Sequence, residues 1–374
     1  MIPLPTSPPT VIAFRVDASL DTGSGHVMRC LTLADELSRR GGVCHFLCRA
    51  HQGHLMDAIQ ARGYQMHRLP KAASAELCPD RQAPAHAAWL GTDWVSDSHH
   101  SREVLEGLAP SWLVVDHYAL DVRWERHAVP EGVKLLAIDD LADRPHHADV
   151  LLDQNLGRDP ADYAGLVPAH CQVLAGPRYA LLRPEFAQWR AASLARRATP
   201  ALGRVLVTMG GVDKDNVTGR IMTMLKECNL PDGCTISVVM GTNAPWLEAV
   251  RELAETMPWP TEVAVGVQDM ARRMAQADLA IGAAGSTSWE RCCLGLPTLM
   301  VVLADNQFGI ARALHRQGAA LTLGHSQTLA EFRHALSHCM NQEALRNMSQ
   351  RAATVVDGAG VERLCKTMFR GSRP

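Results

Sequence analysis

The chain has 374 residues, of which 47% are hydrophobic and 20% are charged, and its formal net charge is −2. This balance supports a large buried core and excludes a wholly disordered chain. It also lacks the basic excess that is typical of proteins that bind nucleic acid or anionic membranes. Aromatic residues make up only 5%, which argues against stacking on single-stranded nucleic acid. The length predicts two domains of ordinary size.

Counts of cysteine and histidine exclude further classes. The 11 cysteines lack the paired spacing of a zinc site, and their odd number predicts reduced thiols in a cytoplasmic protein. None of the 17 histidines lies in an HExxH motif, so we predict no metal site. Residues 1–10 are rich in proline and lack a basic start, and we expect a loose tail there. No apolar run is long enough to span a membrane.

Residues 11–152 alternate short apolar runs with amphipathic stretches, the pattern of parallel strands joined by helices. The expected strands are residues 11–14, 44–48, 112–115, 135–138 and 150–152, and the expected helices are residues 31–40 and 55–62. Residues 72–101 are polar and irregular, so we expect a long loop or an insertion there.

A junction rich in arginine and proline follows, at residues 183–204, and the alternation then restarts. Strands are expected at 205–208, 236–240, 261–265, 277–281 and 299–303, with helices at 217–227 and around Trp289. Both halves begin with a strand, a glycine turn and a helix. We therefore predict an α/β protein with two Rossmann-like domains that face each other across a cleft. The expected parts are a tail over 1–10, an N-terminal domain over 11–185, a linker over 186–203 and a C-terminal domain over 204–374.

The sequence GSGHVMRC at residues 23–30 places His26 in a glycine-rich turn between the first strand and the first helix. In an open α/β sheet such a turn faces the ligand crevice, and an imidazole there can exchange a proton near neutral pH. A turn that only connects the two elements explains the pattern about equally well. The turn is neither GxGxxG nor a P-loop, so we predict no dinucleotide, no ATP and no cofactor. Asp17 is close enough in the sequence to orient the imidazole.

Polar residues also follow two other strands of the first half. Asp116, His117 and Tyr118 follow residues 112–115, and Asp139 and Asp140 follow residues 135–138. Strand ends of this kind lie over the ligand crevice, although aspartates there commonly cap the next loop. The sequence shows no partner for His117.

The second half holds candidate ligand turns at residues 208–213, 282–290 and 303–307. The first two place small residues before a helix, where free backbone N–H groups and hydroxyls suit a phosphate or a diphosphate. For the second turn alone, a helix capped by Ser286, Thr287 or Ser288 is the simpler explanation. Two such turns opposite a histidine turn favour a diphosphate-bearing ligand between the domains.

Glu290 lies on the first turn of the helix that follows residues 282–286, and two explanations fit it equally well. The helix dipole stabilises a carboxylate at this position without any ligand. The same carboxylate could instead accept hydrogen bonds from the two hydroxyls of a ribose.

Short motifs in a fixed order support a family resemblance. They lie at residues 17–19, 23–30, 115–118, 138–143, 153–155, 176–186, 209–213, 285–293 and 305–307. From about residue 11 onward the chain resembles the UDP-sugar hydrolases of pseudaminic acid biosynthesis, which act on a UDP-linked 2,4-diacetamido-2,4,6-trideoxy sugar. That family is similar to GT-B glycosyltransferases of the MurG type, but it transfers the sugar to water. The chain has Ala284 where the family more often has glycine, which puts contact of this N–H with phosphate in question.

The resemblance implies that UDP lies in the C-terminal half and that its sugar faces the N-terminal half. It assigns the catalytic histidine to His26, and the tyrosine and asparagine of the sugar site to Tyr118 and Asn306. The neutral imidazole would take a proton from water during attack on the anomeric carbon, with inversion and without a metal. Amides at residues 210–211 and 286–288 would stabilise the leaving UDP.

The remaining substrate-binding residues expected from these motifs are Asp17, Gly23, Ser24, Gly25, Arg29, Asp116, His117, Gly210, Gly211, Asp213, Gly285, Ser286, Thr287, Ser288, Glu290 and Gln307. Beyond a UDP-sugar and water we expect no nucleic-acid or membrane partner, and we expect a monomer or a weak homo-oligomer. A GT-B glycosyltransferase and a UDP-sugar 2-epimerase are alternatives with the same fold. A nucleotide-sugar-binding protein without turnover is an alternative of another class.

Overall fold

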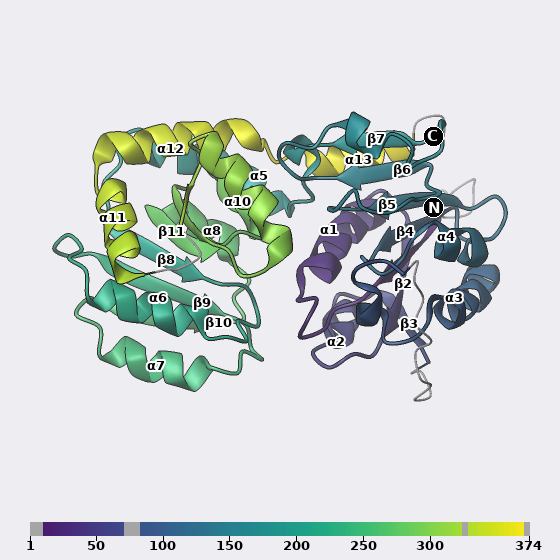
Figure 1. The fold of residues 1–374 in the computed structure, drawn as a ribbon, viewed down its shortest axis with the longest axis horizontal. Helices are drawn as coiled ribbons and strands as arrows, with labels where there is room; N and C mark the ends of the chain where they lie inside the picture. Colours follow the sequence, from purple (N-terminus) through teal and green to yellow (C-terminus); the bar gives the residue numbers. More distant parts are fainter. Residues whose placement is uncertain (1–9, 71–82, 324–327, 370–374) are drawn as a thin grey trace, which may run out of the picture. The chain divides into compact units, whose positions relative to one another are not determined.

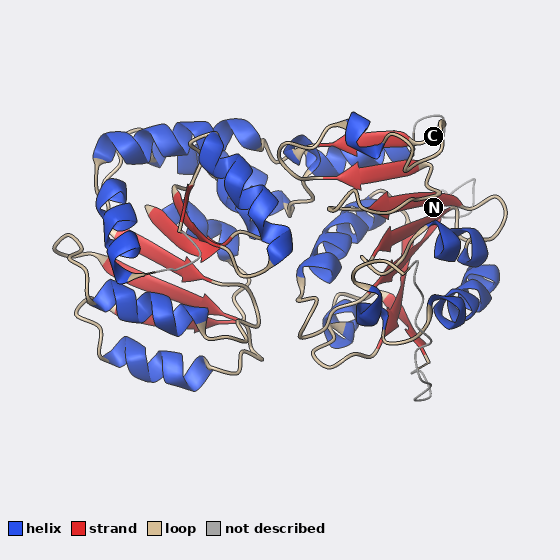
Figure 2. Ribbon diagram, in the orientation of Figure 1, coloured by secondary structure: helices blue, strands red, loops and turns tan. Residues whose placement is uncertain are grey.

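The computed structural model describes residues 10–70, 83–323 and 328–369, and the expected tail at 1–9 lies outside them. The chain forms two compact units. Unit 1 comprises the described residues up to Leu181 together with those from Val361 onward, and unit 2 comprises Leu182–Gly360. In each unit the strands form one sheet with helices packed around it (Figures 1 and 2).

Unit 1 contains a parallel sheet of seven strands in the order β3-β2-β1-β4-β5-β6-β7. The strands are β1 (Val11–Val16), β2 (Val43–Arg49), β3 (Gln65–Leu69), β4 (Trp112–Asp116), β5 (Lys134–Ile138), β6 (Val150–Asp153) and β7 (Gln172–Ala175). The helices are α1 (Gly25–Arg39), α2 (Met56–Ala61), α3 (Trp94–Leu108), α4 (Val122–Ala128) and α13 (Gly360–Met368), with 3-10 turns η1 (Ala87–Leu90), η2 (Pro160–Tyr163) and η3 (Pro177–Tyr179). Each strand that we expected in this half is confirmed within two residues.

The side chains of β1 alternate between two cores. Ile12 and Phe14 belong to a core shared with α1 and α13, whereas Ala13 belongs to a core shared with α3 and α4. Successive side chains of a strand point to opposite faces, so a strand covered on both faces is mostly apolar, although β1 also buries Arg15. This is why the strands of the first half were recognisable as continuous apolar runs.

Helix α3 corrects the expectation of an irregular loop up to residue 101. Three of its fully buried residues are polar, namely Asp97, Ser98 and Ser101. Asp97 accepts hydrogen bonds from Arg15 (Nε, 3.1 Å; Nη2, 2.8 Å) and from Trp124 (Nε1, 2.9 Å). These polar residues interrupt the apolar face that Leu105 and Leu108 contribute to the core, so the periodicity of the sequence did not reveal the helix.

Unit 2 contains a parallel sheet of six strands in the order β10-β9-β8-β11-β12-β13. The strands are β8 (Arg204–Thr208), β9 (Thr235–Met240), β10 (Thr261–Val265), β11 (Leu279–Ala283), β12 (Thr298–Val301) and β13 (Leu321–Thr322). The helices are α5 (Pro184–Arg196), α6 (Val217–Lys226), α7 (Leu247–Glu255), α8 (Met270–Gln276), α9 (Thr287–Cys293), α10 (Phe308–Arg316), α11 (Leu329–Cys339) and α12 (Gln342–Val355), with a 3-10 turn η4 (Asp305–Gln307). Strands β11 and β12 lie up to two residues from the expected positions.

The boundaries of the units differ from those expected at both ends of the second half. Most of the expected linker is helix α5, which belongs to unit 2: Arg190 donates to the carbonyl oxygens of Val356 (3.0 Å) and Ala353 (2.7 Å). Helix α13, expected in the C-terminal domain, belongs to unit 1 because Leu364 and Met368 are buried in the core that contains Phe14. Apolar burial, rather than chain order, therefore decides which unit these helices join.

Candidate active site

His26 is the second residue of α1 and follows a tight turn. Gly23 makes this turn possible because its φ of 72° lies in the left-handed region, and its N–H donates to the carbonyl of Ser19 at 2.9 Å. The His26 side chain is 11% exposed, and its Nδ1 lies 2.6 Å from Oδ1 of the fully buried Asp116. A carboxylate only accepts, so Nδ1 carries the proton and the neutral imidazole keeps its lone pair on Nε2. The ring is thus oriented as a base.

Arg29 lies one helical turn after His26 and binds the same carboxylate. Its Nε lies 2.6 Å from Asp116 Oδ2, its Nη2 lies 2.7 Å from Asp116 Oδ1, and its Nη1 lies 2.8 Å from Asp140 Oδ2. Burial would raise the pKa of Asp116, but the Arg29 guanidinium and His26 hold this pKa well below its ordinary value. Arg29 and Asp116, both expected to bind substrate, are therefore engaged in holding His26.

Tyr118 contacts both the imidazole of His26 and the carboxylate of Asp140. Its hydroxyl donates to Asp140 Oδ2 at 2.6 Å, and its ring meets the His26 ring edge to face with centroids 4.6 Å apart. Burial and the nearby Asp140 raise the pKa of Tyr118, which keeps the phenol neutral. The sequence motifs identified these residues, and the structure places Tyr118 directly beside His26.

Asp17 and His117 lie inside unit 1 and do not orient His26. Asp17 Oδ2 is 2.8 Å from Arg15 and 3.4 Å from both His51 Nε2 and His117 Nε2. Asp17 Oδ1 accepts the backbone N–H of Arg49 at 2.7 Å. The suggestion that Asp17 positions the imidazole is wrong, because these interior groups occupy its carboxylate. His117, for which the sequence showed no partner, is held by Asp17.

The turn between β8 and α6 is exposed at Gly210 and Gly211, and Gly210 has a φ of 97°. Asp213 points away from solvent, since its carboxylate accepts the backbone N–H groups of Val217 (2.9 Å) and Thr218 (2.8 Å). These two bonds satisfy donors at the start of α6 that have no partner within the helix. Asp213 was expected to contact substrate, and the structure instead places it as a helix cap.

The turn between β11 and α9 contains an exposed Ser286 whose side chain does not cap the helix. Thr287 Oγ1 and Ser288 Oγ both accept from the buried Arg291, at 3.2 and 3.0 Å. None of the three hydroxyls is therefore a helix cap, which was the simpler explanation of this turn. The Ala284 N–H donates to Val301 O at 2.9 Å and so is occupied within the sheet.

Glu290 is partly buried, and its carboxyl makes no hydrogen bond or ion pair with any other described residue. Burial raises the pKa of Glu290 to about 7, although Arg183 and Arg291 act in the opposite direction. On η4, Asn306 is exposed, whereas Gln307 holds its own turn because its Oε1 accepts the Leu303 N–H at 3.0 Å. Glu290 and Asn306, like Ser286, thus have side chains that stay available to a ligand.

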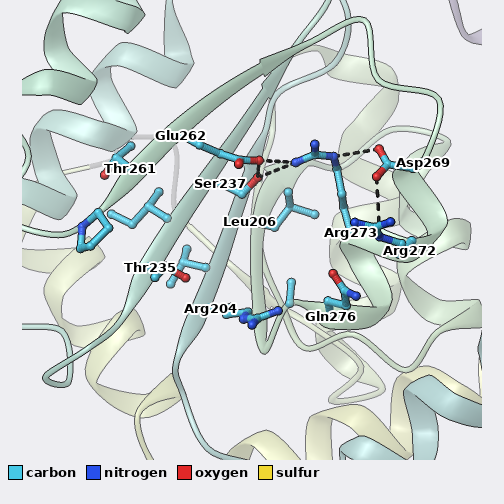
Figure 3. A pocket seen from close by; sticks show the side chains of 14 residues that line it. Arg204, Leu206, Thr235, Ser237, Thr261, Glu262, Asp269, Arg272, Arg273 and Gln276 are labelled. Atoms are coloured by element: carbon cyan, nitrogen blue, oxygen red, sulfur yellow. Dashed lines mark hydrogen bonds and ion pairs between the residues drawn. The ribbon is translucent and has the colours of Figure 1, made fainter.

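A cavity of about 500 Å³ opens in unit 2 over β8, β9, β10 and α8 (Figure 3). Arg204, Thr235 and Thr261 line it at the starts of their strands, and Arg273 is bonded to Glu262 and Asp269 on its rim. No residue that the sequence identified as a site residue lines this cavity. The candidate site residues lie beyond the opposite, carboxyl ends of the strands, where α/β sheets bind their ligands.

Two further observations concern the described part of the chain. Its ten cysteines are free thiols, and no group of three or more His, Cys, Asp or Glu side chains in it is arranged to hold a metal ion. Among the same residues, no helix has the length and hydropathy needed to cross a membrane.

Comparison with known proteins gives consistent results. Residues 205–363 match the glycosyltransferase family 28 C-terminal domain. The chain is 27% identical to UDP-2,4-diacetamido-2,4,6-trideoxy-beta-L-altropyranose hydrolase of Campylobacter jejuni over 308 residues, which are 82% of this chain and 97% of that protein. It is 29% identical to the spore coat polysaccharide biosynthesis protein SpsG of Bacillus subtilis over 201 residues, or 53% of this chain and 58% of that protein. The crystal structure of MurG from Acinetobacter baumannii aligns with a TM-score of 0.69 at 18% identity, over 97% of this chain and 100% of that one.

The chain has the GT-B fold, which it shares with MurG. The two parallel-sheet α/β domains are those that the sequence predicted, and the resemblance to the UDP-sugar hydrolases is confirmed by the relative from Campylobacter jejuni. The name of that relative indicates an enzyme that acts on a UDP-sugar. The family 28 match carries the name of a glycosyltransferase domain, so hydrolysis and transfer to another acceptor are the two reactions to be distinguished.

Proposed function

We propose that this GT-B protein hydrolyses a UDP-linked 2,4-diacetamido-2,4,6-trideoxy sugar, releasing UDP and the free sugar in pseudaminic acid biosynthesis. The observation that carries the proposal is the imidazole of His26, held by Asp116 at 2.6 Å with Nε2 left as a base. A base that is fixed in this way suits the removal of a proton from water. The relative named as a hydrolase of such a UDP-sugar supports the choice of substrate.

In the proposed reaction His26 Nε2 takes a proton from water while the water oxygen bonds to the anomeric carbon. The bond between that carbon and the β-phosphate oxygen breaks, and its electron pair leaves with UDP. The transition state resembles an oxocarbenium ion, and attack from the face opposite UDP inverts the anomeric centre. His26 becomes an imidazolium that Asp116 stabilises, in the way an aspartate supports the histidine of other catalytic sites.

Unit 2 is the proposed UDP-binding unit. Backbone amides at Gly210 and Gly211 and at the start of α9 would face the diphosphate, and the Glu290 carboxylate would accept the ribose hydroxyls. Asn306 would contact the sugar. In this scheme protein donors stabilise the leaving charge without a metal, so EDTA should leave the rate unchanged.

The free thiols of the described cysteines agree with a reducing compartment, and we propose that the reaction takes place in the cytoplasm.

The direct test is the variant His26→Asn, assayed for UDP release from the diacetamido UDP-sugar. Loss of the base should lower kcat by about 100- to 10,000-fold, while the Kd for UDP stays within about twofold of wild type. In water labelled with oxygen-18, the label should enter the sugar and not UDP. Release of UDP at nearly the wild-type rate by a folded variant would refute the role of His26. Label in UDP would refute cleavage of the C–O bond.

A glycosyltransferase is the second candidate, and the family 28 match of residues 205–363 favours it. Such an enzyme would release UDP slowly in water and faster when an acceptor alcohol is supplied. Mass spectrometry of the sugar product, with and without candidate acceptors, separates the two reactions. Free sugar as the main product at full rate without any acceptor supports hydrolysis, and a glycoside product supports transfer.

A further inference from the structure

An unassigned group of aromatic side chains adjoins His26 within unit 1. Trp89 stacks on Tyr118 with ring centroids 5.8 Å apart and an interplanar angle of 25°. His86 lies 5.5 Å from the Tyr118 ring and 4.3 Å from the Trp89 ring. The Tyr118 ring also contacts the His26 ring, with centroids 4.6 Å apart, so the three aromatic side chains form a continuous surface that ends at the proposed base. We call His86, Trp89 and Tyr118 the aromatic wall.

The backbone that carries this wall is firmly held. Trp89 lies on η1 and is followed by Leu90, which is 2% exposed. Gly91 then turns the chain with a φ of 68°, and a Cβ atom there would approach His51 Cε1 to 2.7 Å. Asp93 begins α3 by accepting the Ser96 N–H at 2.8 Å. Trp89 is therefore presented by an ordered segment between a buried leucine and a capped helix.

The Tyr118 hydroxyl is bound to Asp140, but the polar atoms of His86 and Trp89 are unused. Within the described residues, the indole N–H of Trp89 and the ring nitrogens of His86 make no hydrogen bond, although both side chains keep some exposed surface. Other tryptophans differ: Trp124 donates to Asp97 at 2.9 Å, and Trp246 donates to Lys214 O at 2.8 Å. Burial lowers the pKa of His86, so its imidazole is neutral at neutral pH. The wall thus offers apolar ring faces together with a free donor.

An acetamido group matches this combination. It carries a methyl group, which packs favourably on an aromatic face, and a carbonyl oxygen, which accepts from an indole N–H. A sugar hydroxyl could use only the donor and would leave the ring faces uncovered. The chemistry of the wall therefore distinguishes an acylated amino sugar from a fully hydroxylated one.

We propose that Trp89, supported by His86, is the specificity-determining residue that receives an acetamido group of the sugar beside His26. The ring of Trp89 packs on the acetamido methyl, and its N–H binds the acetamido carbonyl. This inference rests on the proposed action on a UDP-sugar and adds the part of the substrate that unit 1 recognises. No motif pointed to this role, since Trp89 lies in the segment that was interpreted as a polar loop.

The test compares two substrates, the diacetamido UDP-sugar and its diformamido analogue, which keeps both amides and lacks both methyl groups. Wild type should prefer the acetamido form by about tenfold or more in kcat/KM. Trp89→Ala should reduce this preference to within about threefold. Trp89→Phe keeps a ring and loses the N–H, so it should retain the preference while kcat/KM falls about 3- to 10-fold for both substrates. The Kd for UDP should be unchanged in both variants.

Trp94→Ala is the matched control, because Trp94 contacts Arg123 and His127 and is not part of the wall. It should keep the wild-type preference. A wild type without preference, or a Trp89→Ala variant that keeps the full preference, would overturn the proposal. If neither substrate is hydrolysed, the hydrolase assignment fails by itself. The ratio of the two Kd values, measured by calorimetry on the same variants, then decides the role of Trp89.

Discussion

Asp116 is shared between a base and a buried cation, and this arrangement defines its role. Both of its oxygens accept from Arg29, and Oδ1 also accepts from His26. At 2.6 Å the carboxylate is the closest partner of Nδ1, compared with 3.2 Å for Arg29 Nη2. The negative charge therefore fixes the tautomer of His26, whereas Arg29 fixes the carboxylate.

Replacing this carboxylate by an amide tests its positioning role. In Asp116→Asn the amide can donate to Nδ1, which moves the ring proton to Nε2 and removes the lone pair that takes the proton from water. We expect kcat to fall about 100- to 10,000-fold with little change in the KM for the UDP-sugar. Steady-state kinetics measure both. Asp143→Asn is the control, since Asp143 is 39% exposed and pairs only with Arg144. A kcat within threefold of wild type would contradict the role.

The proposed contact of Glu290 with UDP makes binding depend on pH. Burial raises its pKa to about 7 in the free protein, so near neutrality it is half protonated. Ribose hydroxyls donate, and the ionised carboxylate accepts them better than the acid does. The affinity for UDP should therefore rise, by up to about tenfold, as the pH increases from 6 to 8. The terminal phosphate of UDP also titrates, and its effect on binding is the same for wild type and for Glu290→Gln. Calorimetry on the two proteins therefore isolates the contribution of Glu290. Equal pH dependence in the two proteins would exclude a contact with Glu290.

The first turn of α6 is capped by Asn216 and also by a carboxylate that the sequence assigned to the ligand. Asp213 has a φ of 45° and accepts two backbone N–H groups of the first turn. Asp213→Ala should therefore lower the free energy of unfolding by about 1–2 kcal/mol, whereas Asp213→Asn, which suits this φ and still caps, should cost less. Urea unfolding and the Kd for UDP, measured on both variants, test this. Unchanged stability combined with weakened UDP binding would instead indicate that Asp213 contacts UDP directly.

The elements that were predicted and those that were missed differ in what their residues face. Strands covered on both faces carry runs of apolar residues, so β1, β4 and β5 were found. Strand β3 lies at the edge of its sheet, and its sequence QMHRL is mostly not buried, so no apolar run marked it. Strand β7, at the other edge, buries only one of its four residues, Leu174. Local patterns therefore report burial rather than strand formation itself.

Single residues of the candidate site could be predicted from the sequence, but the contacts between them could not. The glycine turn indicated His26, and the polar strand end indicated Asp116, but the two are 90 positions apart. Their contact depends on β4 lying next to β1, with Val16 paired to Asp116 in the sheet. The same neighbouring strands bring His117 to Asp17. Trp89 could not be found in this way, because no motif or periodicity marked its segment.

At the scale of the whole molecule, the chain leaves unit 1 after Leu181 and returns to it at Val361. Helix α13 then contributes Leu364 and Met368 to the core that also contains Leu33 of α1. Arg363 adds a hydrogen bond to Arg178 O at 2.8 Å. Unit 1 therefore closes its core with residues that follow the whole of unit 2 in the sequence.

Truncation of Leu364 should consequently weaken unit 1 and leave unit 2 intact. Leu364 is fully buried, and removal of its side chain leaves a cavity that costs about 2–5 kcal/mol in Leu364→Ala. Hydrogen exchange read by mass spectrometry should show faster exchange in α1 and β1, with unchanged exchange in α6 and β9. Leu336→Ala, at an equally buried leucine of the unit 2 core, should give the reverse pattern. Faster exchange in unit 2 alone after Leu364→Ala would mean that α13 stabilises the other unit, and the assignment of this helix by its apolar contacts would be wrong.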